Sequence, residues 1–359
     1  MTEISIVGAG IIGLAHAYAY ARRGHRVRVY DRSPQAEGAS IRNFGMIWPI
    51  GQPAGQRLDI AMRGRSLWLT VLRDAELPYH PDGSLHLAYF EDEEALAREF
   101  ATREPQRAQW LSRADTLARS NAVQPDGLRG ALFSSSEVVV DARLTLARLP
   151  TFLHERYGVT FHWSHAVRHV ADLPGDRVLI CSGHDFETLY PEVFADSGLT
   201  RCKLQMLRTI PQPDGWRLGP ALAGGLTMRF YSSFAQCAAL APLRRRFDET
   251  MPEYGRWGIH VMASQTADGA ITLGDSHEYG PSPSVFNKDE IDNLILAYLQ
   301  QFAHFPQMRI AERWHGIYAK HPEKPYCVFE PEPAVRIVTG LGGAGMTLSF
   351  GLADILYEA

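Results

Sequence analysis

Three glycines near the N-terminus have the spacing of a backbone site for a pyrophosphate group. Gly8, Gly10 and Gly13 follow the apolar run at residues 4–7 in the pattern G-x-G-x-x-G, and residues 11–24 have helical composition. In such a turn the first glycine permits a tight bend and the second lets the backbone approach the phosphates. The third lets the helix pack closely against the strand. The N–H groups and dipole at the start of the helix then attract the negative charge.

An acidic residue at the end of the next strand extends this pattern. The alternating segment at residues 26–31 closes on Asp31, whose carboxylate can accept hydrogen bonds from the hydroxyls of an adenosine ribose. The glycines alone are a weak signal, because a chance glycine turn in an ordinary βαβ unit is the alternative. Strand, turn, helix, strand and distal acid together predict a dinucleotide site. The motif does not separate NAD from FAD, since both contain an ADP half.

A second glycine-rich turn near the C-terminus favours a flavin. Residues 334–341 form an apolar strand, and "GGAG" then opens a helix predicted over residues 346–359. A reduced flavin gathers negative charge at N1 and O2, and a helix start stabilises such charge. An enzyme that uses only a nicotinamide has no need of this second site. The alternative is a structural junction between a strand and a helix.

Two further segments have the small and polar residues that a cofactor needs close to the backbone. One is "EGASIRNFGMIWP" at residues 37–49, which follows the second strand, and the other is a strand that ends directly before Ser182 and Gly183. Either could pass near a ribityl chain or a pyrophosphate. Each of them, taken singly, could be an ordinary loop.

In this order the four motifs resemble the D-amino-acid oxidase, glycine oxidase and sarcosine oxidase superfamily of FAD-dependent oxidoreductases. The most specific parts of the resemblance are the N-terminal motif through Asp31, residues 38–45, residues 271–278 and the final glycine turn. It covers most of the chain and is weakest between residues 90 and 135. It implies that the first turn holds the pyrophosphate of a non-covalently bound FAD and that the last turn holds the flavin ring.

The resemblance also implies the individual cofactor contacts, from the adenine end to the flavin end. They are Gly8, Gly10, Ile11, Ile12, Gly13, Asp31, Arg32, Ser40, Arg42, Asn43, Gly45, Met46, Val167, Ser182, Gly183, Gly342, Gly343, Ala344, Gly345, Met346 and Thr347.

The family fold implies an α/β protein with two domains. A Rossmann-type FAD-binding domain is expected from residues 1–80, 136–200 and 311–359, and a glycine-oxidase-like α+β substrate domain with a mostly antiparallel sheet from residues 81–135 and 201–310. Alternating segments predict strands of that sheet, and two segments carry helical spacing. The strands are expected at residues 202–209, 226–233, 258–264 and 269–275, and the helices at residues 93–104 and 288–305.

One position departs from the amino-acid-oxidising relatives. In them the sequence Trp-x-Gly is followed by an Arg-Pro pair whose guanidinium binds the substrate carboxylate. Here Trp314 and Gly316 match, but Tyr318 and Ala319 replace the pair. The two-pronged donor for a planar carboxylate is therefore missing from its usual place.

Other cations could bind an anionic substrate group instead. The candidates are Lys203, Arg229 and Lys320, with Arg42 and His321 as further possibilities. A lysine can hold a tetrahedral phosphonate as a point charge, and residues 38–53 and 340–353 resemble a branch of the family associated with aminophosphonate breakdown. The implied substrate is 2-aminoethylphosphonate or its N-methyl form, which would give phosphonoacetaldehyde and ammonia or methylamine.

Four aromatic or imidazole side chains are candidates for the reaction site. His260 and Tyr318 are the predicted catalytic residues, and both are also predicted to contact substrate together with Trp48 and His277. An aromatic wall such as Trp48 would attract a cationic amine. Packing in the core or at a turn is the alternative for Trp48, His260 and His277.

Composition restricts the remaining possibilities. A net charge of −4 argues against nucleic acid, and the four widely spaced cysteines suit neither a metal site nor a disulfide framework. The apolar N-terminal stretch is interrupted by glycines and His16, so we expect no signal peptide or membrane span, a cytoplasmic location and no metal. The sequence leaves the oligomeric state open. It also leaves open whether O₂ or another acceptor reoxidises the flavin, because Thr272 stands where oxygen-reactive relatives have a lysine.

The sequence is also compatible with other functions. Within the family, the substrate could instead be a glycine-, sarcosine- or D-amino-acid-like compound. A flavin monooxygenase is less well supported, because "LGDSHE" lies too early for the motif that binds the ribityl hydroxyls. A non-catalytic flavoprotein and an NAD-dependent dehydrogenase belong to other classes; the second glycine turn argues against the dehydrogenase.

Overall fold

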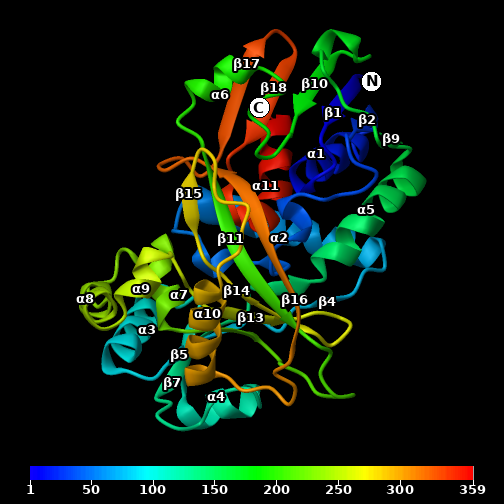
Figure 1. The fold of residues 1–359 in the computed structure, drawn as a ribbon. Helices are drawn as coiled ribbons and strands as arrows, with labels where there is room; N and C mark the ends of the chain where they lie inside the picture. The colour runs from blue at the N-terminus through cyan, green and yellow to red at the C-terminus, as the bar shows by residue number, and fades with distance from the viewer. Residues whose placement is uncertain (359) are drawn as a thin grey trace.

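The computed structural model describes residues 1–358, and Ala359, the last residue of the predicted final helix, lies outside them. Figure 1 shows two lobes. The upper lobe holds both chain ends and one sheet, and the lower lobe holds a second sheet with most of the remaining helices. Two long strands, β11 (Thr200–Thr209) and β16 (Ile310–Lys320), run from one lobe toward the other.

The upper sheet has a Rossmann-type arrangement. Its strand order is β17-β18-β10-β1-β2-β9, and all neighbours are parallel except β17, which is antiparallel to β18. Parallel order puts the carboxyl ends of β1, β2, β10 and β18 at one edge, where ligands bind in open α/β sheets. The strands are β1 Glu3–Val7, β2 Arg26–Tyr30, β9 Thr160–His162, β10 Arg177–Ile180, β17 Cys327–Glu332 and β18 Val335–Thr339.

Four helices pack together beside this sheet. The first follows the N-terminal glycine turn and the last follows the C-terminal one, and a long helix from residue 56 onward lies against the last. A Cβ at Gly351 would lie 2.0 Å from the carbonyl oxygen of Ile60, so these two helices are in backbone contact there. The helices are α1 Ile11–Ala21, α2 Gln56–Asp74, α5 Ala142–Tyr157, which packs on α1, and α11 Gly345–Glu358.

The lower sheet is mostly antiparallel, as predicted for the substrate part. Its order is β15-β11-β14-β13-β12-β5-β7-β6, with β16 also paired to β11, and only β5 and β12 run parallel. The elements not yet given are β5 Ser84–Ala88, β6 Gln109–Ser112, β7 Gly130–Ser134, β12 Ala221–Ala223, β13 Met262–Gln265, β14 Ile271–Gly274 and β15 Glu278–Gly280.

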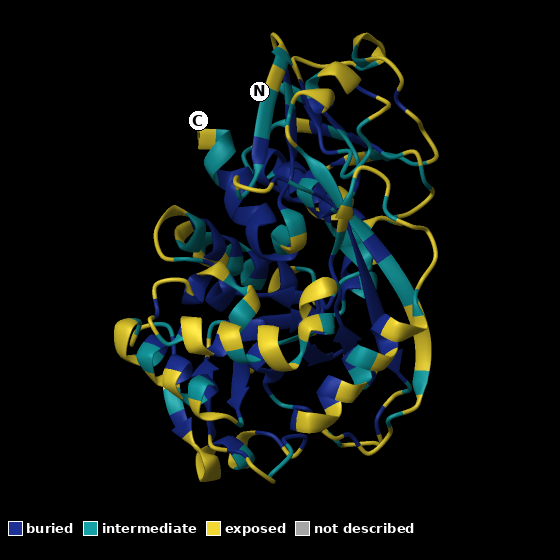
Figure 2. Cartoon of the chain, turned by 60° about the vertical axis from the view of Figure 1, so that its left-hand side comes forward, coloured by how far each residue is buried: buried dark blue, intermediate teal, exposed yellow. Residues whose placement is uncertain are grey.

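Helices and a small third sheet complete the structure. Figure 2 shows buried strands in the interior and exposed residues on the outer helices and loops. The small sheet contains β3 Met46–Ile47, β8 Val138–Val140 and β4 Tyr79–His80. The other helices are α3 Glu91–Arg103, α4 Arg113–Arg119, α6 Pro191–Ala195, α7 Gly225–Phe230, α8 Leu240–Thr250, α9 Pro252–Arg256 and α10 Asp289–Phe302. The 3₁₀ turns are η1 Ala39–Ile41, η2 Pro49–Gly51, η3 Val170–Asp172, η4 Ser232–Phe234 and η5 Gly342–Ala344.

One strand prediction was wrong. Residues 226–233 contain most of α7 and the first part of the turn η4 instead of a strand. The backbone N–H of Leu226 donates to the Tyr298 hydroxyl, and Leu226, Thr227 and Met228 are all buried. A short alternating run does not by itself distinguish a strand from a packed helix, and tertiary packing decided here.

The predicted fold class is confirmed, while the predicted domain boundaries stay a prediction. The strand β16 spans the predicted boundary at residue 311, and it pairs with β11 of the lower sheet along its length. It then forms an isolated bridge from Lys320 to Leu341, beside the C-terminal glycine turn. This strand therefore connects the two lobes at the position where the family arginine is replaced.

Candidate active site

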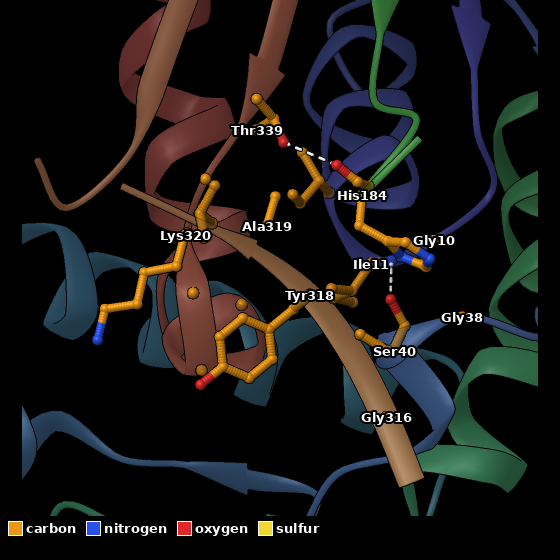
Figure 3. A pocket seen from close by; sticks show the side chains of 18 of the residues that line it. Gly10, Ile11, Gly38, Ser40, His184, Gly316, Tyr318, Ala319, Lys320 and Thr339 are labelled. Atoms are coloured by element: carbon orange, nitrogen blue, oxygen red, sulfur yellow. Dashed lines mark hydrogen bonds between the residues drawn. The ribbon is translucent and has the colours of Figure 1, made fainter. Parts of the chain in front are cut away.

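One large cavity brings both glycine turns together with residues of the lower sheet. Its volume is about 970 Å³, at the upper end of the usual range for small-molecule and cofactor sites. The wall includes the first turn, the segment around Ser40, the C-terminal turn and the end of β16. Figure 3 shows Gly10, Ile11 and Ser40 on one side and Tyr318 and Lys320, both from β16, on the other.

The first glycine turn has the close approaches that its spacing predicts. Gly8 has a φ of +103°, and a Cβ on it would lie 2.4 Å from the carbonyl oxygen of Cys181. A Cβ at Gly13 would lie 1.9 Å from the Gly8 carbonyl oxygen, so only glycine allows this helix to pack on the strand. Gly10 faces the cavity, and a Cβ there would meet only Ser40 Oγ, 3.2 Å away.

Asp31 is held in a fixed orientation at the end of β2. Its Oδ2 accepts a hydrogen bond of 2.7 Å from the Ala9 backbone N–H, and its Oδ1 accepts one of 2.9 Å from Ser33. A carboxylate oxygen can accept a second hydrogen bond, so Asp31 retains acceptor capacity toward the cavity that it lines. This arrangement fits the ribose of an ADP group.

The C-terminal turn places a second helix start on the same cavity. A Cβ at Gly345 would have Ile11 Cγ2 as its nearest neighbour, at 3.8 Å, so the starts of α11 and α1 are adjacent. The Thr347 hydroxyl accepts a 2.9 Å hydrogen bond from the Trp48 backbone N–H. Two adjacent helix starts, each preceded by glycines open to one cavity, fit a ligand with a pyrophosphate and a ring that becomes anionic. FAD has both groups.

Most of the residues predicted from the sequence meet at this cavity. Those that line it are Gly8, Gly10, Ile11, Ile12, Asp31, Arg32, Ser40, Arg42, Asn43, Met46, Trp48, Val167, Ser182, Gly183, His260, His277, Tyr318, Lys320, Gly342, Gly343, Ala344, Gly345, Met346 and Thr347. Gly13 and Gly45 are not part of the wall. At both positions a Cβ would lie 1.9 Å from a backbone carbonyl oxygen, so they support the wall from behind.

Two predicted substrate-binding cations point elsewhere. The buried Lys203 donates to the Phe286 carbonyl oxygen and lies 3.6 Å from Glu278 Oε1. Arg229 forms an ion pair of 3.1 Å with Asp248. Neither residue belongs to the cavity wall. We therefore do not include them among the proposed substrate contacts.

Lys320 and Arg57 supply the cavity with positive charge. Lys320 Nζ donates to the Tyr279 hydroxyl at 3.3 Å, and Arg57 Nη2 donates to Gln52 Oε1 at 3.0 Å. Neither forms an ion pair with a carboxylate anywhere in residues 1–358. Burial lowers the pKa of Lys320, and the positive charge of Arg57 adds a smaller lowering.

Tyr318 presents its hydroxyl group to the C-terminal glycine turn. The side chain is buried, and its oxygen would lie 3.5 Å from a Cβ at Gly343. Burial, reinforced by the neighbouring Cys202 and Tyr279, raises the pKa of Tyr318 well above its usual value. Tyr318 is therefore a neutral hydrogen-bond donor at neutral pH.

His260, Asp275 and His277 form a buried cluster on the cavity wall. His260 Nε2 lies 3.1 Å from Asp275 Oδ1, and His277 Nε2 lies 3.9 Å from Asp275 Oδ2. Burial, with the positive charges of Arg229 and Lys320, holds the pKa of His260 well below its usual value. Burial also lowers the pKa of His277 to about 4 and raises that of Asp275 well above its usual value.

Aromatic rings surround this cluster and the adjoining cavity. The Phe230 ring lies 4.2 Å from the His260 ring and 4.6 Å from the His277 ring, measured between centroids. Tyr231 and Trp48 also line the cavity, and the buried Trp48 Nε1 has no hydrogen-bond partner within the described part of the chain. This arrangement can hold a small amine between aromatic faces.

Sequence reasoning missed Arg57 and Asp275 as site residues. Arg57 lies in the first turn of α2, and no motif surrounds it that would mark it as a site residue. Asp275 is the last residue of the predicted strand at residues 269–275 and lies inside a segment that carried the family resemblance, so its position was a usable signal. Only the folded chain shows that Asp275 lies between two histidines.

Two further features concern the cysteines and the helices. All four cysteines are buried and free. None of the helices among residues 1–358 is both long and apolar enough to cross a membrane.

Two characterised proteins are similar to this chain in sequence. It is 26% identical over 341 residues to an opine oxidase subunit of Agrobacterium tumefaciens (strain Ach5), covering 89% of this chain and 82% of that protein. It is 24% identical over 206 residues to glycine oxidase of Geobacillus kaustophilus (strain HTA426), covering 50% of this chain and 54% of that protein.

Solved structures share the fold. The TM-score is 0.75 with glycine oxidase from Geobacillus kaustophilus, at 17% identity, covering 99% of this chain and 93% of that one. It is 0.74 with L-proline dehydrogenase from P. horikoshii, at 16% identity, covering 99% and 92%. The fold is therefore glycine-oxidase-like, with a Rossmann-type part and a mostly antiparallel second sheet.

The family comparison extends over almost the whole chain. Residues 3–359 match the family described as "DAO: FAD dependent oxidoreductase". The two glycine turns and the fixed Asp31 on one cavity have the chemistry that FAD requires. The chain belongs to the DAO family of FAD-dependent oxidoreductases and is an enzyme that binds FAD.

Proposed function

We propose that this enzyme oxidises a small primary or secondary amine that carries a phosphonate group. The favoured substrate is 2-aminoethylphosphonate or its N-methyl derivative. The observation that carries the proposal is the exchange of cationic groups: Tyr318 stands where relatives have a carboxylate-binding arginine, whereas Lys320 and Arg57 line the cavity without carboxylate partners. Lys320 and Arg57 are half-buried and have only neutral hydrogen-bond partners, so an anionic ligand would offset the cost of removing their charges from water.

The positions of the cations support a phosphonate over a planar carboxylate. Lys320 on β16 and Arg57 on α2 belong to separate elements, so each can contact a different oxygen of a tetrahedral group that has three. A planar carboxylate could be bound by the two parallel donors of the Arg57 guanidinium alone, which would leave Lys320 without an anionic partner. The Tyr318 hydroxyl is neutral, so it can donate a hydrogen bond to the anion without adding a charge to the site.

The chain's own residues would chiefly position the amine. Bound FAD supplies the two-electron acceptor for the hydride equivalent that leaves the carbon next to nitrogen. The aromatic walls of Trp48 and Phe230 favour the amine end, while Lys320 and Arg57 hold the other end, so that the reacting C–H bond is fixed in direction. The amine nitrogen loses a proton, and water hydrolyses the resulting imine to phosphonoacetaldehyde and ammonia or methylamine.

A second candidate is an amine that carries a carboxylate, such as glycine, sarcosine or a D-amino acid. The similarity to a glycine oxidase and to part of an opine oxidase favours it. Lys320 and Arg57 would then bind the carboxylate in place of the family arginine. A non-catalytic flavoprotein is the third candidate, from a different class.

Several further assignments belong to the proposal. The FAD-binding part would be residues 1–80, 136–200 and 311–359, and the substrate-binding part residues 81–135 and 201–310. His260 and Tyr318 would lie beside the reacting amine, and O₂ or another acceptor would reoxidise the flavin. The four buried, free cysteines suit a reducing compartment such as the cytoplasm.

The visible spectrum of the purified protein tests the proposal. It is recorded under anaerobic conditions before and after addition of N-methyl-2-aminoethylphosphonate, with glycine, sarcosine and D-alanine as separate additions. Bleaching of the flavin band by the phosphonate alone is the expected result. Bleaching only by the amino acids would favour the second candidate, and a flavin band that no amine bleaches would favour the third.

A further inference from the structure

The cluster of His260, Asp275 and His277 has a geometry that the proposed amine oxidation does not explain. His260 and Asp275 lie next to the paired strands β13 and β14. The Asp275 N–H donates to the His260 carbonyl oxygen at 2.8 Å, and the His260 N–H donates to the Asp275 carbonyl oxygen at 3.2 Å. The strand pairing therefore fixes the positions of both residues. All three side chains are buried, and all three line the cavity. Each offers one ligand atom, and these three atoms lie within 4.8 Å of one another.

The contact between Asp275 and His260 is short but is not a hydrogen bond. Asp275 Oδ1 lies 3.1 Å from His260 Nε2, yet this buried oxygen has no hydrogen-bond partner among the described residues. Two groups that are close without pointing at each other are typical of ligands that point at a common third atom. Ligand atoms on a tetrahedral zinc ion lie about 3.3 Å apart. His260 Nε2 lies 3.1 Å from Asp275 Oδ1 and His277 Nε2 lies 3.9 Å from the other carboxylate oxygen, Oδ2, so each imidazole is near a different oxygen of the same carboxylate.

His277 carries a second feature of metal-binding histidines. Its Nδ1 lies 2.9 Å from the Gly258 carbonyl oxygen. A backbone carbonyl can only accept, so Nδ1 carries the proton and Nε2 presents its lone pair toward Asp275. Histidine ligands commonly donate their other ring N–H to such a carbonyl, which fixes the tautomer and orients the ring.

We propose that His260 Nε2, Asp275 and His277 Nε2 form a binding site for a divalent transition-metal ion of the zinc and iron class. Two imidazoles and one carboxylate suit these ions better than Mg²⁺ or Ca²⁺, which prefer oxygen ligands. Three protein ligands leave a coordination position open, and the cluster's place on the cavity wall directs that position toward the cavity. Water or an anionic oxygen of a bound small molecule would complete the coordination.

Surrounding charges set the expected strength of binding. Lys320 and Arg229 are the cations that act on His260, and Asp275 is the carboxylate within the cluster. Nearby positive charge weakens the binding of a cation, so the ion should be removable by a chelator and should not resist extraction as a closed structural zinc site does.

Metal content of the FAD-loaded enzyme tests the proposal without reference to activity. The protein is dialysed against EDTA, incubated with ZnSO₄, passed through a desalting column and measured by inductively coupled plasma mass spectrometry. Flavin absorbance gives the FAD content of the same samples. Wild type should retain about one zinc per chain, and D275N and H277Q should retain none. H315Q is the matched control, because His315 contacts Asn287 and lies outside the cavity wall.

Two outcomes would overturn the proposal. One is a wild-type enzyme that retains no zinc, in which case the three residues share protons among themselves. The other is equal zinc in wild type, D275N and H277Q, which would place the metal elsewhere. If either variant fails to bind FAD, the zinc content of the wild-type enzyme alone decides between the outcomes. Crystals grown with zinc should show an anomalous peak between the three side chains, and a peak at another location contradicts the site.

Discussion

At the scale of single residues, the replacement of an arginine by Tyr318 is the most informative feature. The substitution removes a charge from the place where relatives bind an anion, yet other cations line the cavity, among them Lys320 on β16 and Arg57 on α2. In the proposed function this changes the position and shape of the anion site. Substrate selection should therefore depend on Lys320 and Arg57 together.

Lys320→Ala tests this directly. Loss of a charged hydrogen-bond donor to a bound phosphonate costs about 1.5–3 kcal/mol, so the KM for the aminophosphonate should rise by roughly tenfold to a hundredfold. The flavin content should stay unchanged. Steady-state kinetics with FAD absorbance on the same samples measures both. Lys288→Ala is the control, since Lys288 pairs with Glu278 outside the cavity wall. An unchanged KM would remove Lys320 from the anion site.

The pH dependence of substrate binding is a second residue-scale prediction. Burial and the charge of Arg57 lower the pKa of Lys320, so it loses its proton at a lower pH than an ordinary lysine. The protonated form binds the anion, so KM should be lowest below this lowered pKa and rise as the pH increases through it. In Lys320→Arg the side chain stays charged. Alkaline pH profiles of KM should therefore be flatter in the variant, and identical profiles would contradict the assignment.

At the scale of secondary structure, the packing of α11 on α2 positions the C-terminal glycine turn. The two helices touch through backbone atoms, because Gly64 and Gly351 have no side chains at the crossing. The Trp68 indole N–H donates to the Met346 carbonyl oxygen at 2.7 Å, in the first turn of α11. The start of α11 on the cavity wall is therefore held by contacts within the first two turns of that helix.

Gly351→Ala should separate these helices. The new Cβ would lie 2.0 Å from the Ile60 carbonyl oxygen, which cannot move without moving α2. Overpacking of this kind costs about 1–3 kcal/mol, and the displaced helix start should also weaken FAD binding. Urea unfolding and fluorescence titration with FAD measure the two effects. Gly280→Ala, where nothing lies within 4 Å of the added Cβ, should behave as wild type. Equal stability of both variants would show that the helices adjust freely.

At the scale of the whole molecule, Asp354 links the C-terminal helix to the helices α1 and α2. Its buried carboxylate accepts from Arg23 at 2.7 Å and Arg63 at 2.5 Å, and it also pairs with Arg22. Burial alone would raise the pKa of Asp354, but the hydrogen bonds from Arg23 and Arg63 lower it below its ordinary value. The three arginines are partly exposed, so solvent screens part of this stabilisation.

Asp354→Asn should lower the stability of the enzyme by about 1–3 kcal/mol at neutral pH, since three charged hydrogen bonds are lost or weakened. The folded pKa lies below the unfolded value, so the contribution of Asp354 is present above the unfolded pKa and disappears as pH falls through the folded one. Thermal unfolding at pH 7 and at acid pH should therefore show wild type and variant converging on acidification. A constant difference between them would contradict this account.

The sequence alone determined the cofactor side of this protein. Glycines, a distal acid and helix starts act through local geometry, because backbone N–H groups and close approaches depend on residues that are near one another in the chain. Gly8 and Gly13 therefore have the close backbone approaches that their spacing predicted. The fold class followed from the family resemblance, which rests on the order of these local motifs.

Only the tertiary structure decided the substrate side. Lys203, Arg229 and Lys320 were equivalent as cations in the sequence, and the fold left only Lys320 on the cavity wall. Arg57 joined it from a distant segment. Asp275 came to lie between His260 and His277 because β13 pairs with β14. Which charged side chains share a low-dielectric cavity depends on long-range strand pairing and helix packing, and a local pattern of residue types does not contain that information.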